Sequence, residues 1–108
     1  MSTRVVLMGV KGGPAVRGKG AWPTSSLIEI GGRTAVVDCG AGVTRGLVDA
    51  GVALRDLSLI FITHLHSDHY LELGPLLHTA WTTGMRNAVR VFGPAGLKRH
   101  VELFLEAM

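Results

Sequence analysis

The sequence has 108 residues, of which 47% are hydrophobic, and this length and composition are typical of a single domain with a packed core. The net charge of +3 and the pI near 9.6 make the chain mildly basic, but no dense run of Lys or Arg predicts a dedicated nucleic-acid surface. No apolar run approaches the roughly 20 residues of a membrane span, and nothing at the N-terminus resembles a signal peptide, so we expect a cytoplasmic protein. The single cysteine, Cys39, excludes an intrachain disulfide.

The N-terminal part of the chain predicts three strands and one long loop. Residues 4–9, rich in Val and Leu, predict the first strand. Residues 10–23 contain many Gly and Pro residues and predict a loop, which is either functional, as long loops often are, or a flexible surface segment. The loop lacks the Gly-Lys-Ser/Thr ending of a P-loop, which excludes that kind of phosphate site. Residues 24–30 and 33–38 predict two further strands, joined by the Gly31-Gly32 pair as a hairpin.

The remainder of the chain alternates predicted helices and strands. A short helix over residues 43–50 ends at Gly51, and residues 56–62 predict a buried strand. A helix over residues 70–83 follows, with Pro75 disturbing its beginning. The last two predicted elements are a strand over residues 89–92 and an amphipathic helix over residues 94–108. The pattern predicts an α/β fold.

A cluster of possible metal ligands lies between the predicted strand 56–62 and the helix that follows. His64, His66, Asp68 and His69 fall within six residues, and imidazoles and carboxylates are natural ligands for zinc and similar divalent ions. In an extended segment alternate side chains point the same way, so His64 and His66 can bind one metal while Asp68 and His69 serve a second. Alternatively, the histidines stabilise turns and Asp68 is a helix N-cap.

Four other residues near or beyond this cluster are weaker candidates. Asp38 ends a predicted strand beside the expected metal site, although it also suits a turn in which the side chain bonds its own backbone. Cys39 is expected to be a small buried thiol and not a ligand. His78 and His100 lie on predicted helices, and we expect His78 to be structural or at the surface and His100 to be solvated.

The His64-X-His66-X-Asp68-His69 pattern after an apolar strand resembles the signature of the metallo-β-lactamase fold hydrolases. Residues 35–40, Ala-Val-Val-Asp-Cys-Gly, are similar to the strand of that family that ends in Asp and Gly. Residues 71–77 and 91–97 resemble the branch that contains the tRNA 3′-processing endonuclease ribonuclease Z and its arylsulfatase-like relatives. The resemblance covers nearly the whole chain, but Ala41 stands where the ribonuclease Z pattern has an acidic residue.

The resemblance implies a fold and a site. Residues 1–108 would form the N-terminal half of a metallo-β-lactamase-like domain, which is half of a four-layer αββα sandwich with a mixed β-sheet and flanking helices. It also implies two zinc ions per complete site, with manganese or iron as alternatives. His64 and His66 would hold the first ion, and Asp68 and His69 the second. Asp68 would also be catalytic by orienting the attacking hydroxide, and Asp38 would support the ligands from behind.

The function implied is metal-dependent hydrolysis of a phosphodiester or ester bond, since zinc lowers the pKa of bound water to about 7. A ribonuclease Z-like phosphodiesterase acting on RNA is the first expectation for the substrate, and an arylsulfatase or lactone hydrolase is the second. The rival hypothesis is a non-catalytic half-domain that binds metal or a partner and assembles as an oligomer.

The chain lacks ligands that the family's complete site takes from downstream, namely two histidines and a bridging aspartate. After His69 it offers only His78, His100 and no aspartate. We therefore expect a fragment of a longer hydrolase, or else a complete short protein that finishes its fold with a partner. In both cases one face of the sheet should be uncovered, metal binding by this chain alone should be weak, and the partner should be a second copy in a homodimer or a missing C-terminal half.

Overall fold

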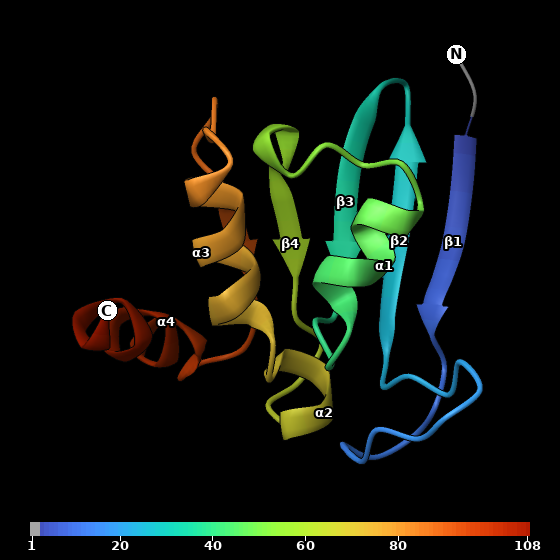
Figure 1. The fold of residues 1–108 in the computed structure, drawn as a ribbon. Helices are drawn as coiled ribbons and strands as arrows, with labels where there is room; N and C mark the ends of the chain where they lie inside the picture. Colours follow the sequence, from blue (N-terminus) through green and yellow to red (C-terminus); the bar gives the residue numbers. More distant parts are fainter. Residues whose placement is uncertain (1–2) are drawn as a thin grey trace.

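A five-stranded sheet runs through the computed structural model, which describes residues 3–108 (Figure 1). The strands follow one another across the sheet in sequence order. They are β1 (Thr3–Gly9), β2 (Ser25–Ile30), β3 (Arg33–Val37), β4 (Leu59–Phe61) and β5 (Arg90–Phe92).

The direction of the strands changes halfway across the sheet. β1, β2 and β3 pair antiparallel, and the predicted hairpin between β2 and β3 is confirmed: Ile30 pairs with Arg33, and Gly31 and Gly32 have φ values of 57° and 80°. Positive φ at both central residues is the conformation that favours glycine in a two-residue hairpin. The pairs β3·β4 and β4·β5 are parallel, so a helical crossover must return the chain each time.

The helices provide those crossovers and lie on one side of the sheet (Figure 1). α1 and a short 3₁₀ turn connect β3 to β4, whereas α2 and α3 connect β4 to β5, and α4 ends the chain. Among residues 3–108, no helix is both long and apolar enough to cross a membrane. The helical segments are α1 (Val43–Asp49), the 3₁₀ turn (Leu54–Asp56), α2 (Ser67–Tyr70), α3 (Leu73–Thr82) and α4 (Leu97–Ala107).

The core lies between this helical layer and one face of the sheet. Leu27, Val36 and Ile60 come from the three central strands, are aligned by the strand register, and are fully buried. Helices α1 and α3 supply most of the side chains that cover them, among which Leu47 and Leu76 are also fully buried. Burial of each such side chain contributes about 1.5–3 kcal/mol, so this layer fixes the sheet against the helices.

The opposite face of the sheet is uncovered and apolar, as predicted from the sequence. By the strand register, Val5 and Ile30 share this face with Phe61 and Phe92, and these four side chains are 40–61% exposed. Phe61 and Phe92 stack with their ring centroids 5.3 Å apart, and the Arg90 guanidinium carbon lies 5.2 Å from the Phe92 centroid. A contiguous apolar face of this kind marks a surface that another part of a protein covers.

Three predicted boundaries were wrong. The single helix predicted over residues 70–83 is two helices, because the chain is redirected between Tyr70 and Leu73, and Pro75 lies in the first turn of α3, where a missing N–H leaves no hydrogen bond unmade. The strand predicted over residues 56–62 is only β4, since the 3₁₀ turn takes up its beginning. The last helix starts at Leu97, after Gly96 with φ 99°, and not at residue 94.

Candidate metal centre

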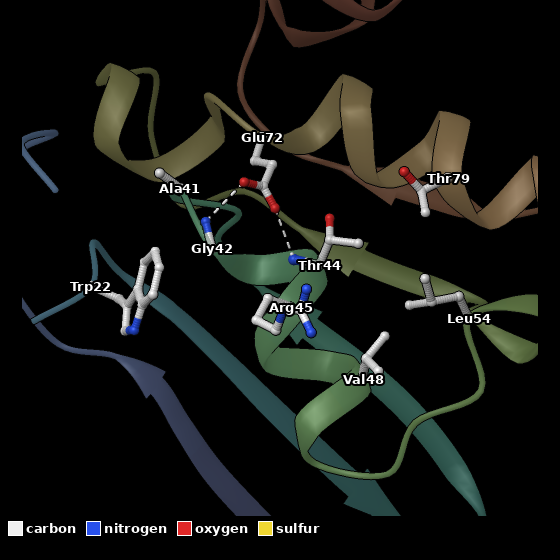
Figure 2. A pocket seen from close by; sticks show the side chains of 9 residues that line it. All are labelled: Trp22, Ala41, Gly42, Thr44, Arg45, Val48, Leu54, Glu72 and Thr79. Atoms are coloured by element: carbon white, nitrogen blue, oxygen red, sulfur yellow. Dashed lines mark hydrogen bonds between the residues drawn. The ribbon is translucent and has the colours of Figure 1, made fainter. Parts of the chain in front are cut away.

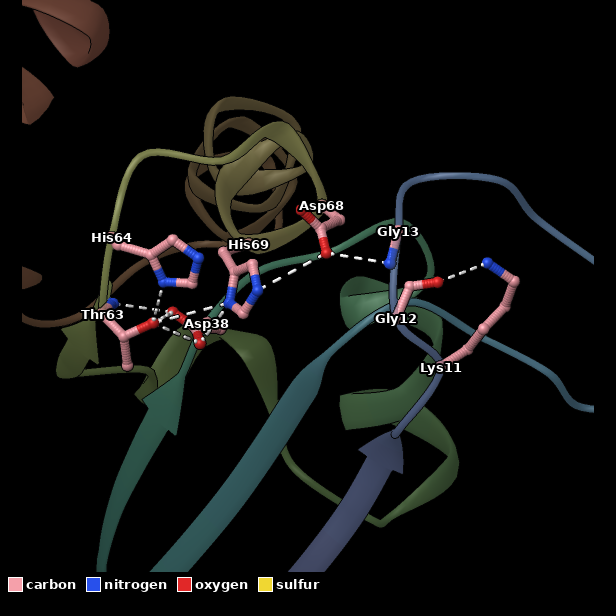
Figure 3. A network of polar contacts seen from close by, with 8 residues as sticks. All are labelled: Lys11, Gly12, Gly13, Asp38, Thr63, His64, Asp68 and His69. Atoms are coloured by element: carbon pink, nitrogen blue, oxygen red, sulfur yellow. Dashed lines mark hydrogen bonds and ion pairs between the residues drawn. The ribbon is translucent and has the colours of Figure 1, made fainter.

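The predicted site lies at the carboxyl ends of two adjacent parallel strands, where Asp38 directly follows β3 and the predicted ligand segment follows β4, with Asp68 and His69 in α2 (Figure 3). The Asp38 N–H donates to the Phe61 carbonyl at 2.8 Å, and the Ile62 N–H donates to the Phe92 carbonyl at 2.8 Å. These two bonds continue the ladder by one residue beyond the strands, so Asp38 and Thr63 emerge side by side. Open α/β sheets commonly place their functional sites at this edge.

Asp38 is the buried centre of a hydrogen-bond network. Its side chain is 4% exposed, and its carboxylate accepts hydrogen bonds from the Thr63 N–H at 2.8 Å and from the Thr63 hydroxyl at 2.9 Å. The Nδ1 atom of His69 lies 2.7 Å from Asp38 Oδ2. Asp38 also has φ 64°, a left-handed conformation that costs energy for a residue with a Cβ, although Asp tolerates it better than most.

This network determines which nitrogen of His69 is free. A carboxylate offers only acceptors, so Nδ1 of His69 must carry the hydrogen that Asp38 receives. In neutral imidazole the other nitrogen, Nε2, then keeps its lone pair, which is the form that binds a metal. The supporting role predicted for Asp38 requires a buried carboxylate bonded to a histidine, and the structure contains that contact.

Two other imidazole rings lie close to that of His64. The ring centroids of His64 and His66 are 4.6 Å apart, and those of His64 and His69 are 4.0 Å apart. The Thr63 hydroxyl lies 3.0 Å from His64 Nδ1, and because its own hydrogen goes to Asp38, it accepts from that nitrogen. Thr63 thus links His64 to the network that holds His69.

Asp68 faces the N-terminal loop as well as His69. Its Oδ2 atom accepts a hydrogen bond from the Gly13 N–H at 3.1 Å and lies 3.5 Å from His69 Nε2. The loop of residues 10–23 is therefore in contact with the predicted site, which supports its functional interpretation over that of a free surface segment.

The turn after Asp38 packs tightly against the ligand segment. The Cys39 N–H donates to the His69 carbonyl at 2.6 Å, and a Cβ on Gly40 would lie 2.5 Å from the Asp68 carbonyl oxygen. Cys39 is fully buried, and burial, reinforced by the charges of Asp38 and Glu72, raises the pKa of its thiol far above the usual range. The prediction of a small buried thiol is confirmed.

The structure does not assemble a complete ligand set. Within residues 3–108, no three His, Cys, Asp or Glu side chains are arranged so that they could hold a metal ion. His78 lies on α3 with its ring 6.0 Å from that of Trp81. His100 is half-buried, not solvated as predicted, because its ring packs edge to face on Tyr70 at 4.8 Å.

Two residues of this region were not identified from the sequence. Thr63 precedes His64 directly, and a hydroxyl beside a candidate ligand was a usable signal. Glu72 gave no local signal, because its partners, the backbone N–H groups of Gly42 and Thr44, are 30 and 28 residues away. Glu72 lines a cavity of about 530 Å³ between α1 and α3, which no predicted ligand lines (Figure 2).

The comparison with protein families identifies the fold. Residues 23–103 match the family model described as the metallo-beta-lactamase superfamily. The chain belongs to the metallo-β-lactamase superfamily. Members of this superfamily generally bind divalent metals, commonly zinc, and the imidazoles and carboxylates of residues 64–69 are the donor types that such ions take.

The known relatives of this chain include ribonuclease Z proteins. It is 41% identical over 105 residues to a ribonuclease Z of Mycobacterium sp. strain KMS, covering 95% of the chain and 36% of the relative. A ribonuclease Z of Methanosarcina mazei is 29% identical over 101 residues, covering 94% of the chain and 32% of the relative. The chain therefore spans about a third of the length of these relatives.

Solved structures of the superfamily have the same architecture. The short form of human tRNase Z superposes with a TM-score of 0.81 at 28% identity, covering 95% of this chain and 38% of that protein. The metallo-β-lactamase fold protein YhfI of Bacillus subtilis gives a TM-score of 0.73 at 25% identity, covering 96% and 40%. The predicted α/β fold, a mixed sheet flanked by helices, is confirmed.

Proposed function

We propose that residues 1–108 form the N-terminal half of a metal-dependent hydrolase domain. In this proposal His64 and His66 hold one divalent ion, and Asp68 and His69 hold the second, with zinc as the first choice and manganese or iron as alternatives. The observation that supports it best is the Asp38–His69 contact of 2.7 Å, because it leaves Nε2 of His69 as a ligand.

The residues of the chain have separate roles in this proposal. Asp38 fixes the ring of His69. The Thr63 hydroxyl bonds both the Asp38 carboxylate and Nδ1 of His64, and so connects His64 to the same carboxylate. Asp68 binds Gly13 through Oδ2, which leaves Oδ1 to orient the attacking water. Bound zinc lowers the pKa of a coordinated water to about 7 and so supplies the nucleophile at neutral pH.

The proposed substrate class rests on similarity to the relatives. Similarity to ribonuclease Z proteins supports a phosphodiester, with RNA as the first substrate to test, and the net charge of +3 is compatible with a polyanion. Ala41, where the ribonuclease Z pattern has an acidic residue, keeps an arylsulfate or a lactone as the second choice.

The chain requires a further contribution for a complete site. Two protein ligands per metal are fewer than the three or four that zinc normally takes, and the uncovered sheet face requires a covering layer. We propose that the layer and the missing ligands come from a C-terminal half or from a second copy of this chain in a homodimer. The incomplete ligand set is also the observation that favours the second candidate function, a non-catalytic half-domain that assembles with a partner.

Metal analysis and phosphodiester turnover separate the two functions. Zinc, manganese and iron should be titrated into this chain and into a version extended by a downstream half, and their binding measured. Hydrolysis of bis(p-nitrophenyl) phosphate should be measured with both proteins. His64→Ala and His66→Ala should weaken metal binding, whereas the control His100→Ala, outside the ligand segment, should not. The hydrolase proposal fails if neither version binds metal and neither turns over the substrate.

A further inference from the structure

Glu72 lies at the break between α2 and α3 and bonds to a different helix. Its two carboxylate oxygens accept hydrogen bonds from the backbone N–H groups of Gly42 and Thr44, both at 2.8 Å (Figure 2). These two N–H groups belong to the N-cap and the second residue of α1. A charged acceptor at a helix N-terminus forms short, strong hydrogen bonds and also interacts favourably with the helix dipole.

Helix α1 has no cap of its own. Gly42 has no side chain to offer, and α1 has no acidic residue in its first turn. A side chain at position 42 is also excluded, because φ is 95° and an added Cβ would lie 2.5 Å from the Trp22 ring. The carboxylate that satisfies this helix end must therefore come from a distant residue, and Glu72 provides it.

The same region is bonded to the segment that carries His69. The Glu72 N–H donates to the Cys39 carbonyl at 2.9 Å, and the Cys39 N–H donates to the His69 carbonyl at 2.6 Å. Cys39 directly follows Asp38, whose side chain binds the His69 ring at 2.7 Å. Asp38 thus binds the His69 ring, and Cys39 binds the His69 backbone. Both Asp38 and Cys39 belong to a turn that the Glu72 hydrogen bonds connect to the junction of α2 and α3.

We propose that Glu72 is a positioning residue for the predicted ligand segment of residues 64–69. In this role Glu72 keeps the His69 ring in the orientation that Asp38 selects. The proposal rests on the proposed function, in that His69 is a metal ligand. Without the Glu72 carboxylate, the turn from Asp38 to Thr44 and the segment from His69 to Glu72 keep the two backbone hydrogen bonds of Cys39 and the His69–Asp38 side-chain bond. The His69–Asp38 bond then opens more often.

Two variants and one control test this role. Glu72→Gln keeps the length of the side chain but presents an NH₂ group to one of the two backbone donors, whereas Glu72→Ala removes both bonds. Glu102→Gln removes an equal charge from an exposed position on α4. In metal-free protein, NMR should measure the rate at which the His69 Nδ1–H proton exchanges with water, under conditions where unfolding curves show every variant to be folded. Zinc affinity should then be titrated on the same samples.

We expect the His69 proton to exchange at least about tenfold faster in Glu72→Gln, and zinc to bind about tenfold more weakly, as is typical when a residue that supports a ligand is lost. Glu102→Gln should leave both values unchanged. A purely structural role would lower the unfolding midpoint and leave the exchange rate of folded protein at the wild-type value, and that result would overturn the proposal. Absence of zinc binding by the wild type would count against the proposed function, while the proton exchange would still decide the role of Glu72. Should Glu72→Ala not fold, Glu72→Gln alone decides.

Discussion

Replacement of Asp38 should reveal how much of the local stability depends on the hydrogen bonds of its buried carboxylate. Asp38→Asn keeps one oxygen but places an NH₂ group opposite a donor, either the Thr63 N–H, which bonds Oδ1, or Nδ1 of His69, which bonds Oδ2. A hydrogen bond to a charged group contributes about 1.5–3 kcal/mol, and a buried donor left unpaired costs about 1–3 kcal/mol. We expect Asp38→Asn to lower the free energy of unfolding by roughly 2 kcal/mol and the Tm by roughly 10 °C.

The positive φ of Asp38 gives a second, independent comparison. Asp38→Ala and Asp38→Gly both remove the carboxylate, but only Ala must hold a Cβ at φ 64°. The left-handed conformation costs a residue with a Cβ about 1–2 kcal/mol relative to glycine. We expect Asp38→Gly to be roughly 1 kcal/mol more stable than Asp38→Ala, the reverse of the usual order inside regular structure.

Urea unfolding followed by circular dichroism measures all three variants. Asp49→Asn, an exposed position on α1, is the matched control for loss of the charge and should stay within about 0.5 kcal/mol of wild type. The reasoning is refuted if Asp38→Asn unfolds at the wild-type urea concentration, or if Asp38→Ala is as stable as Asp38→Gly.

Three further predictions concern the turn, its thiol and the metal. Gly40→Ala should destabilise the protein by at least about 2 kcal/mol, because its Cβ would lie 2.5 Å from the Asp68 carbonyl, whereas Gly12→Ala, with open space around it, should be nearly neutral in unfolding curves. Burial raises the pKa of the Cys39 thiol, so the folded thiol keeps its proton while the unfolded one ionises above about pH 8.5. Above that pH the free energy of unfolding should therefore fall by roughly 1.4 kcal/mol per pH unit. Cys39→Ala should lose this part of the alkaline sensitivity, and equal pH profiles of stability for Cys39→Ala and wild type would contradict the prediction. Calorimetric titration of this chain should show weak, substoichiometric zinc binding, and sedimentation should show a dimer that zinc favours; two tight sites on a monomer would disprove both.

The parts that the sequence predicted well are those that short segments determine. The Gly31-Gly32 pair predicts the hairpin because only local conformation is involved. The ligand segment of residues 64–69 was placed at a strand end because an apolar run stops directly before it. The uncovered sheet face was predicted because the family resemblance covers only one of two layers.

The parts that the sequence did not predict depend on contacts between distant residues. The two residues between α2 and α3, Leu71 and Glu72, are neither proline nor glycine, so the sequence does not signal the break. The break depends on the hydrogen bonds of Glu72 to Cys39, Gly42 and Thr44. The role of Thr63 depends on Asp38, 25 residues earlier, which reaches it only after the two strands have paired. Such partners are visible only once the sheet is assembled.

The uncovered face and the predicted ligand segment of residues 64–69 are neighbours, so we expect assembly and metal binding to be linked. Phe61, 40% exposed, is the last residue of β4 and lies only two residues before Thr63. At about 3.3 Å per residue, any layer that buries Phe61 and its stacked neighbour Phe92 reaches the strand ends from which the histidines project. Burial of that apolar surface contributes about 25 cal/mol per Å², so we expect the covering layer to bind without metal. Its side chains would then lie beside the predicted site, where further ligands are required. Substitution of Phe61 by a polar residue should therefore weaken assembly both with and without metal, whereas loss of His66 should weaken metal binding and leave assembly in metal-free solution unchanged.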